Sequence, residues 1–441
     1  MSGAEQGAAP GRAGSGAGRV AAVRLGSAVA AFGLQLMLAR LMSPADFGAL
    51  IVVMTWVGLA TALASLSLPL VVVRFVADYV ARGQLGAARA VWRYSIGAVF
   101  GGGVAVAVLL LGSAALGGLS LPGVDGRAWP VLGLLLVAAP LLALAAAQLQ
   151  GLQRVVTAEL LSNLARTAVV ITGAVLVPVL ASRAPRVSDL LWIHLVAVLL
   201  LGLACWAWGR SVRPSGWAAA PLQPEPRRWR EVAAGFLGVM LVGALCERID
   251  VLVMGQVGSP EEIARYAVVT RFSQALTVLV VAAHGGMAPR VAAHLVELQA
   301  GRRTALQQEL SRFSRIAALL AGAVALGFVL LGPWLLSLFG PVYRTAAPAL
   351  ALLGAGAVLA CLFGPALLVV TLVGHARVAI AALAAGALAS ALTVALLGPG
   401  QGALGAAIGA ALGMVLPPLV GWWWLRRRWG LDAAVWARAA Q

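Results

Sequence analysis

The stretch Glu231–Arg290 reads EVAAGFLGVMLVGALCERIDVLVMGQVGSPEEIARYAVVTRFSQALTVLVVAAHGGMAPR. Two long and mostly apolar segments, residues 232–257 and 263–289, flank a polar turn at residues 259–262. A helix of about 20 apolar residues is long enough to cross a bilayer. The stretch therefore predicts two membrane-spanning helices joined by a tight turn.

Ionisable residues interrupt both segments: Glu247, Arg248 and Asp250 in the first, and Arg271 and His284 in the second. Such side chains are costly in a membrane unless they face protein or a water-filled cavity, so they mark candidate functional positions. On a continuous helix, Glu247 and Asp250 share one face because they are three residues apart. Arg271 is expected at about the same membrane depth as Arg248.

Two interpretations of this cluster stay open. In the first it is structural, and Glu247 or Asp250 pairs with Arg271. In the second, Arg248 and Arg271 face a cavity and bind an anionic substrate, while Glu247 or Asp250 couples transport to an ion.

The layout of this stretch recurs 216 residues earlier in the chain. Ser259-Pro260 then corresponds to Ser43-Pro44, and Arg290 corresponds to Arg74. A matched spacing over two landmarks predicts an internal duplication. The charges are not repeated, since the counterparts of Glu247, Arg248, Asp250 and Arg271 are Ala31, Phe32, Leu34 and Thr55.

The composition indicates a polytopic membrane protein. Hydrophobic residues make up 61% of the chain and charged residues 11%, against roughly 45–50% and 25% in soluble domains. The mean hydropathy is +0.95. The net charge of +17 comes from 32 basic residues, all of them arginine. No hydrophilic domain is available to bind nucleic acid, so we assign the arginines to the cytoplasmic membrane surface.

The lengths of the apolar segments predict an all-α membrane protein with twelve transmembrane helices in two six-helix lobes. Gly405, Gly409 and Gly413 in the last span predict close packing against a neighbouring helix. The predicted spans are residues 25–42, 47–70, 94–117, 129–150, 160–181, 189–208, 232–257, 263–289, 316–339, 346–374, 378–397 and 403–425.

The distribution of arginine predicts that both termini are cytoplasmic. With this topology 23 arginines lie inside, six lie outside and three lie within spans, as the positive-inside rule requires. Each lobe holds an even number of spans, so the repeats are parallel. The predicted organisation is a disordered cytoplasmic tail (1–24), an N-lobe (25–209), a cytoplasmic linker (210–230), a C-lobe (231–425) and a cytoplasmic tail (426–441).

Arg166 is the third arginine inside a predicted span. The nearest preceding carboxylate is Glu159, seven residues earlier, so no carboxylate lies within one helical turn. An unpaired arginine in a span more often faces a wet cavity than lipid, which makes Arg166 a candidate substrate-binding residue.

Motifs for catalysis, nucleotide binding and metal binding are missing. The sequence contains neither a Walker loop nor an HExxH motif, and Cys205, Cys246 and Cys361 lack CxxC spacing. We therefore predict neither an enzyme nor a cofactor or metal site.

Two segments resemble motifs of a known family. LARLMSPADFGAL (Leu38–Leu50) and ERIDVLVMGQVGSPEEIARYAVVTRF (Glu247–Phe272) resemble paired inter-helix motifs of bacterial oligosaccharide flippases. These Wzx-type flippases of O-antigen synthesis belong to the MATE-like exporters of the MOP (multidrug/oligosaccharidyl-lipid/polysaccharide) superfamily. Ala264 stands where the family often has glycine. The resemblance implies alternating access between two lobes and a cationic cavity for undecaprenyl-pyrophosphate-linked oligosaccharide.

The resulting hypothesis is an inner-membrane flippase of polysaccharide biosynthesis. Its expected partners are the lipid-linked oligosaccharide, membrane lipids and polysaccharide polymerase or assembly proteins, without nucleic acid. The alternative is a MATE-type exporter of drugs or small cations. Drug-exporting relatives usually carry an acidic residue in the first lobe, and predicted spans 1–6 contain none in their cores.

Overall fold

The computed structural model describes residues 10–117, 121–126, 128–285 and 304–437, and every regular element within these ranges is a helix. The chain divides into two compact units. The N-terminal unit comprises residues up to 41 and 57–241, and the C-terminal unit comprises residues 42–56 and 242–441. The divisions fall inside α2 (Pro44–Ala64) and α9 (Pro226–Cys246), so both helices contribute to both units.

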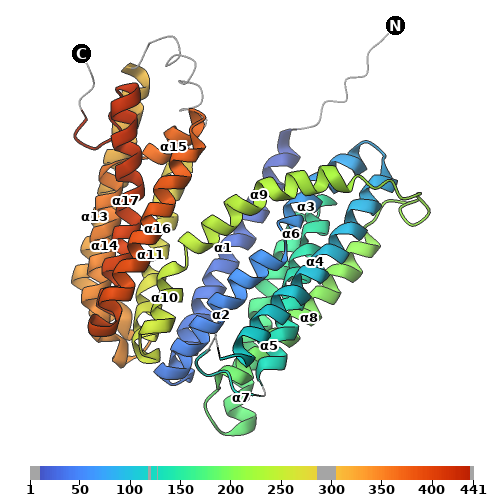
Figure 1. Cartoon of the computed structure of the whole chain (residues 1–441), viewed down its shortest axis with the longest axis horizontal. Coiled ribbons are helices and arrows are strands. Elements are labelled where there is room, and N and C mark those ends of the chain that lie inside the picture. The colour runs from blue at the N-terminus through green and yellow to red at the C-terminus, as the bar shows by residue number, and fades with distance from the viewer. Residues whose placement is uncertain (1–9, 118–120, 127, 286–303, 438–441) are drawn as a thin grey trace. The chain divides into compact units, whose positions relative to one another are not determined.

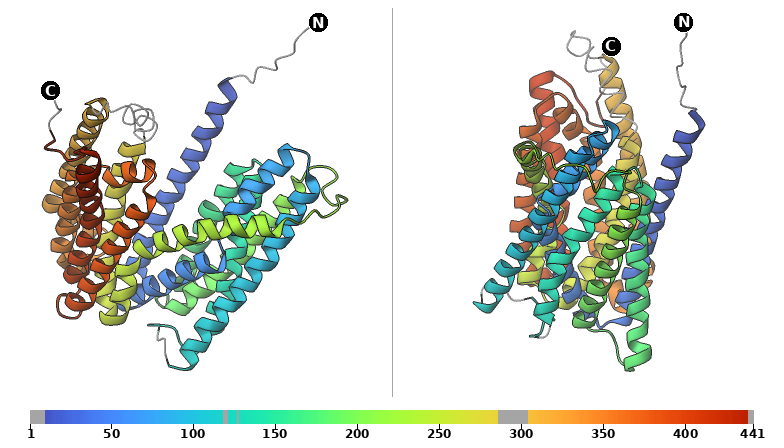
Figure 2. Two further views of the ribbon diagram at one scale, coloured as in Figure 1. Left: turned by 45° about the horizontal axis from the view of Figure 1, so that its top comes forward. Right: turned by 90° about the vertical axis from the view of Figure 1, so that its right-hand side faces the viewer.

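The N-terminal unit is organised around α5, which contacts α3, α4, α6 and α8. Leu135, Leu136, Leu144 and Leu149 of α5 are fully buried. In Figures 1 and 2, α4, α5 and α8 run side by side. The helices of this unit, besides its parts of α2 and α9, are α1 (Pro10–Leu41), α3 (Leu68–Ala81), α4 (Leu85–Ala115), α5 (Ala128–Gly151), α6 (Val155–Glu159), the π-helix η1 (Leu160–Ala165), α7 (Arg166–Ala181) and α8 (Val187–Ser211).

The C-terminal unit packs α17 against both α16 and α14. A Cβ at Gly409 would lie 2.6 Å from Val394 Cγ2, so the approach of α17 to α16 needs the glycine, as the sequence predicts. The helices of this unit, besides its parts of α2 and α9, are α10 (Ile249–Val257), α11 (Pro260–Gly285), α13 (Thr304–Ser337), the 3₁₀-helix η2 (Pro341–Ala346), α14 (Ala347–Leu362), α15 (Ala366–Leu372), α16 (Ala376–Gln401) and α17 (Ala403–Trp429).

Eleven helical segments of the described chain are long and apolar enough to cross a membrane. They match eleven of the twelve predicted spans, and α11 covers most of the remaining one, 263–289. Residues 286–289 of that span lie outside the described residues. The first half of α11 contains Glu261, Glu262, Arg265 and Arg271, which lowers its apolar character. The chain is therefore an all-α, multi-pass membrane protein.

Three predicted spans are interrupted in the structure. Predicted span 47–70 contains the end of α2 at Ala64 and the start of α3 at Leu68. Predicted span 232–257 consists of α9 and α10, separated at Glu247 and Arg248. Predicted span 346–374 consists of α14 and α15. Gly364 between them has a φ of 67°, and the following Pro365 has no amide hydrogen to continue the helix.

The predicted linker 210–230 is packed onto the N-terminal unit. Arg89 Nη1 donates to the Ala218 carbonyl at 2.6 Å, and a Cβ at Gly86 would lie 2.1 Å from the Pro221 carbonyl oxygen. Trp229 at the start of α9 is fully buried, and its indole N–H donates to the Tyr79 hydroxyl of α3 at 3.3 Å. Most of helix α3 lies in the segment between predicted spans 2 and 3.

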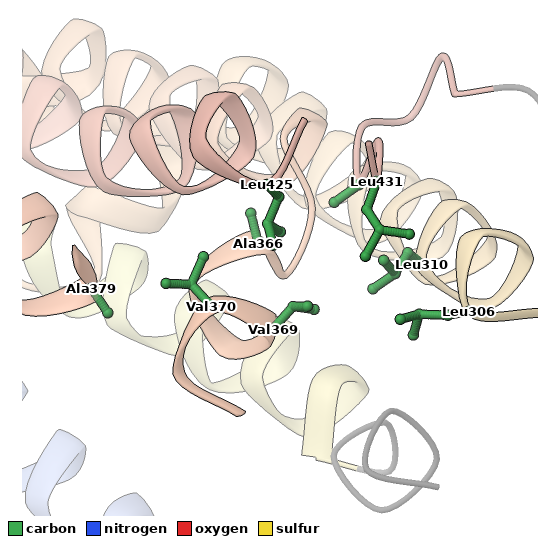
Figure 3. Packing of buried hydrophobic residues seen from close by; sticks show 9 residues of the cluster. Leu306, Leu310, Ala366, Val369, Val370, Ala379, Leu425 and Leu431 are labelled. Carbon is green, nitrogen blue, oxygen red and sulfur yellow. The ribbon is translucent and has the colours of Figure 1, made fainter. Parts of the chain in front are cut away.

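The described part of the N-terminal tail is helical, and the residues that follow α17 are packed. Helix α1 begins at Pro10, so residues 10–24 of the predicted disordered tail are helical. Beyond α17, the Ser314 hydroxyl donates to the Ala433 carbonyl at 2.6 Å. Figure 3 shows the apolar cluster that residues after α17 join, formed by Leu306, Leu310, Ala366, Val369, Val370, Ala379, Leu425, Leu431 and Ala433. The described end of the predicted cytoplasmic tail 426–441, residues 430–437, is therefore packed against the C-terminal unit.

Candidate functional site

Arg166 is the first residue of α7 and directly follows the π-helix η1. It lies within the run Val155–Ala181, which is apolar enough to span a membrane. The side chain is half-buried, and its Nε donates to the Ser162 carbonyl at 2.9 Å. The structure describes no carboxylate partner for Arg166. The acceptor described for its guanidinium is a backbone carbonyl.

Glu159, one residue before the π-helix, is held by other groups. Its carboxylate accepts from Arg24 Nη2 of α1 at 2.8 Å and from Asn163 Nδ2 at 2.8 Å. The Glu159 side chain is 10% exposed, whereas the Arg24 side chain is 64% exposed. Glu159 belongs to the first turns of a membrane-spanning run of the N-terminal unit, outside the cores to which the prediction for spans 1–6 refers. The sequence placed it just outside the apolar segment.

Glu159 and Arg166 are two helical turns apart in the sequence, too far to pair directly, and the π-helix also separates the faces on which they lie. In a regular α-helix with 3.6 residues per turn, positions seven apart lie on the same face. A π-helix closes i→i+5 bonds and so adds a residue to the turn, which rotates the following residues by about 100°. Residues 160–165 therefore turn Arg166 away from the face on which Glu159 meets Arg24.

His194 of α8 lies within electrostatic range of Arg166. Its Nδ1 contacts the Leu190 carbonyl oxygen at 2.8 Å. A carbonyl oxygen only accepts, so Nδ1 carries the hydrogen and Nε2 is the acceptor of the neutral ring. Arg166 and His194 together provide a cation and a titratable ring in the same unit.

In the C-terminal unit, Glu247 and Arg248 occupy the break between α9 and α10. Both residues are exposed. Arg248 precedes α10 with φ −135° and ψ −1°, which is not helical. The prediction that Glu247 and Asp250 share the face of one continuous helix is therefore wrong, because the helix is interrupted between them.

Asp250 lies in the first turn of α10 and binds Tyr266 of α11. The Tyr266 hydroxyl donates to Asp250 Oδ2, and the Val251 amide contacts Asp250 Oδ1 at 2.8 Å. Tyr266 is fully buried. This carboxylate is thus bound by a phenol and a backbone amide, across the turn that the sequence predicts.

Arg271, farther along α11, is half-buried. Its Nη1 donates to Gln274 Oε1 at 2.9 Å, and its Nε is buried without a hydrogen-bond acceptor. The structure describes no ion pair between Arg271 and either Glu247 or Asp250, which the structural interpretation of the cluster requires. Arg271 is therefore a half-buried cation for which the structure describes no carboxylate partner, and such a group favours an anion.

Family membership is decided by sequence. Residues 14–293 match the sequence model of a family described as "Polysaccharide biosynthesis protein". The chain belongs to this family. The matched region contains all five predicted site residues: Arg166, Glu247, Arg248, Asp250 and Arg271.

Solved structures of MOP superfamily transporters share the fold. An inward-facing multidrug resistance MATE family transporter has a TM-score of 0.70 and 15% identity, and the alignment covers 90% of this chain and 93% of that one. The lipid II flippase MurJ, in an inward closed conformation, has a TM-score of 0.60, 11% identity and coverages of 92% and 87%. A MOP transporter from Pyrococcus furiosus, described as having reversed polarity in its binding pocket, has a TM-score of 0.56, 16% identity and coverages of 94% and 93%. No curated protein sequence matches this chain significantly.

Within this family member, the structure adds residues that the sequence did not single out. Arg24 and Asn163 both donate to the Glu159 carboxylate, and His194 lies near Arg166. Tyr266 was noted only as part of a motif, although it binds Asp250. Arg166 belongs to the N-terminal unit, whereas Arg248, Asp250 and Arg271 belong to the C-terminal unit.

Proposed function

We propose that this protein is a flippase that moves lipid-linked oligosaccharide from the cytoplasmic to the outer leaflet of the inner membrane. The observation that carries the proposal is Arg166, a half-buried guanidinium in a membrane-spanning run for which the structure describes only a carbonyl acceptor. Leaving such a charge unpaired is costly, and a bound anion would offset that cost. Family membership supports a role in polysaccharide biosynthesis.

The substrate class follows from the chemistry of arginine. A guanidinium stays charged and presents a planar fork that matches phosphate oxygens in pairs. Undecaprenyl-pyrophosphate-linked repeat units carry phosphates of this kind next to a long apolar tail. Arg166, Arg248 and Arg271 would bind the pyrophosphate, and the tail would stay in the bilayer.

Transport would proceed by alternating access through twelve spans, with both termini in the cytoplasm. Asp250 is our candidate for ion coupling because Tyr266 and a backbone amide hold it in place. Glu247 is the second candidate, at the exposed helix break. Polysaccharide polymerase and assembly proteins would receive the translocated units.

A second candidate function, export of drugs or small cations, is favoured by one observation. Glu159 is a buried carboxylate in the N-terminal unit, where such exporters usually need one. Its charge is already met by Arg24 at 2.8 Å, and Arg166 adds a further positive charge one residue beyond the π-helix. A neighbouring positive charge disfavours cation binding, so this function ranks second.

Substitution of Arg166 tests the choice between the two functions. In a strain whose surface polysaccharide depends on this protein, Arg166→Ala and Arg166→Glu should abolish the polysaccharide while the protein remains inserted. Arg166→Lys should keep partial function, because it retains charge without the bidentate fork. Arg183→Ala is the matched control, since Arg183 lies outside the spans and pairs with Asp189. Wild-type polysaccharide in all three Arg166 variants, together with binding of organic cations, would establish the exporter instead.

A further inference from the structure

An apolar groove runs along the N-terminal unit, apart from the charged residues described above. Residues of α5 line its floor, and residues of α4 and α8 line its walls. The three helices run side by side in Figures 1 and 2. Its volume is about 460 Å³, and its lining includes Trp92, Leu134, Ala145, Leu195, Gly202 and Trp206. Leu134 is 57% exposed, so the groove opens toward the surroundings of the helices.

The groove is about as long as one leaflet of a membrane is thick. Along α5 it extends from Leu134 to Ala145, which is about 16 Å at 1.5 Å per residue. Half of a hydrocarbon core of about 30 Å is close to that length. Along α8 it extends over the same number of residues, from Leu195 to Trp206. An extended acyl chain of one leaflet would fit in it.

Both tryptophans lie at the same end of the groove. Gly209 of α8 approaches Gln148 of α5, which places Trp206 beside the C-terminal end of α5. Helix α4 runs antiparallel to α5, because Gly103 faces Val137 and Gly133 faces Leu111, and Trp92 near the start of α4 is therefore at this end too. Tryptophan is enriched at the membrane–water interface, where this end is expected to lie.

The same end carries positive charge. The Arg210 guanidinium lies 4.7 Å from the Trp206 ring centre. Arg213 follows Arg210 by three residues, and its guanidinium lies 5.6 Å from the Trp217 ring centre. Arg93 follows Trp92 on α4. The structure describes no carboxylate partner for any of these three arginines.

We propose that the groove binds one anionic phospholipid of the cytoplasmic leaflet, with an acyl chain along α5 and the phosphate at Arg210. The cytoplasmic leaflet is rich in anionic lipid, and each nearby arginine contributes about 1 kcal/mol to its attraction. Trp206 joins the two parts of the site, because its ring lines the groove and stacks under the Arg210 guanidinium. This lipid site is independent of the substrate proposed above.

The test is lipid binding to purified full-length protein in detergent micelles, counted by native mass spectrometry during titration with phosphatidylglycerol or phosphatidylcholine. The wild type should bind one phosphatidylglycerol more tightly than phosphatidylcholine. Arg210→Gln should weaken phosphatidylglycerol about fivefold, which corresponds to the loss of one arginine near the surface, and leave phosphatidylcholine unchanged. Arg427→Gln is the matched control. Arg427 also stacks on a tryptophan, 4.5 Å from the Trp423 ring centre, but it belongs to the C-terminal unit and not to the groove.

Filling the groove tests the apolar half of the site. A Cβ at Gly202 would have Leu142 Cβ at 3.9 Å as its nearest neighbour, so Gly202→Leu should fold and extend into the groove. We expect it to abolish the specific lipid. Gly101→Leu on α4 is the control, since nothing lies within 4 Å of its Cβ position. Leu199→Trp is a second groove-filling variant at a wall residue that is 49% exposed.

Two outcomes would overturn the proposal. Equal affinity of the wild type for phosphatidylglycerol and phosphatidylcholine would show that the protein does not select an anionic headgroup. Unchanged lipid binding in both groove-filling variants, relative to Gly101→Leu, would show that the acyl chain does not bind in the groove.

Discussion

The pair between Arg24 and Glu159 allows an asymmetric prediction. Arg24→Ala leaves the Glu159 carboxylate, 10% exposed, with Asn163 as its remaining side-chain donor. Breaking a fully buried pair by removing one partner costs about 3–5 kcal/mol, whereas an exposed pair contributes about 0–1 kcal/mol. One side of this pair is buried and the other is 64% exposed, so we expect a loss of about 1–3 kcal/mol in the free energy of unfolding.

Glu159→Gln should cost less, about 1 kcal/mol or below, because the amide oxygen still accepts from Asn163 and Arg24 is left exposed. With Gln at position 159, the further change Arg24→Ala should have almost no effect. The free energy can be followed by denaturant titration of the purified protein in mild detergent, with each variant compared in one double-mutant cycle.

The control is Arg183→Ala, which breaks a pair whose two side chains are 40% and 21% exposed. Its effect on the free energy of unfolding should be smaller than that of Arg24→Ala, because water screens an exposed pair. If Arg24→Ala is no more destabilising than Arg183→Ala, or if the effects of Arg24→Ala and Glu159→Gln simply add, then Glu159 is not the buried, coupled carboxylate described here.

Two further predictions concern the C-terminal unit. Gly48→Ala should prevent accumulation of folded protein, because its Cβ would lie 1.8 Å from the Pro260 backbone oxygen. Gly58→Ala on the same helix should be tolerated, because nothing lies within 4 Å of its Cβ position. The yield of detergent-solubilised protein and its size-exclusion profile distinguish the two variants. Tyr266→Phe should lower the free energy of unfolding by about 1–3 kcal/mol, because it removes the hydroxyl group that donates to Asp250. Asp250→Asn should lower it by less. Unfolding curves that reverse this order would contradict the hydrogen bond between Tyr266 and Asp250.

Apolar length was a sufficient guide to eleven of the twelve predicted spans. A segment that crosses a bilayer must satisfy its backbone hydrogen bonds internally, so a long apolar run has little alternative to a helix. The break at Gly364-Pro365 had a local signal in its residue types. The break at Glu247 and Arg248 had none in glycine or proline, and the charges alone suggested a site on a continuous helix.

The pairing of side chains was less predictable than the spans. The π-helix at residues 160–165 depends on local hydrogen bonds, such as the Ser162 hydroxyl to the Ala158 carbonyl at 2.7 Å, that composition does not reveal. Asp250 and Tyr266 meet across the turn, and hydropathy gives no weight to such a contact. The packing of α3 could have been found, because its buried residues recur at helical spacing: Leu68, Val71, Val72, Phe75, Val76 and Tyr79.

Each unit contains an arginine for which the structure describes no carboxylate partner, and the local structure around the two arginines differs. In the N-terminal unit a π-helix turns Arg166 away from Glu159. In the C-terminal unit Tyr266 binds Asp250, and Arg271 donates to Gln274. In the predicted duplication, Arg166 and Arg271 fall opposite Ala382 and Thr55, so neither charge is inherited from a common repeat. The two arginines therefore do not correspond to each other in the predicted repeat. Each is a cation for which the structure describes no carboxylate partner, and under the proposed function each would be available to the pyrophosphate of the substrate.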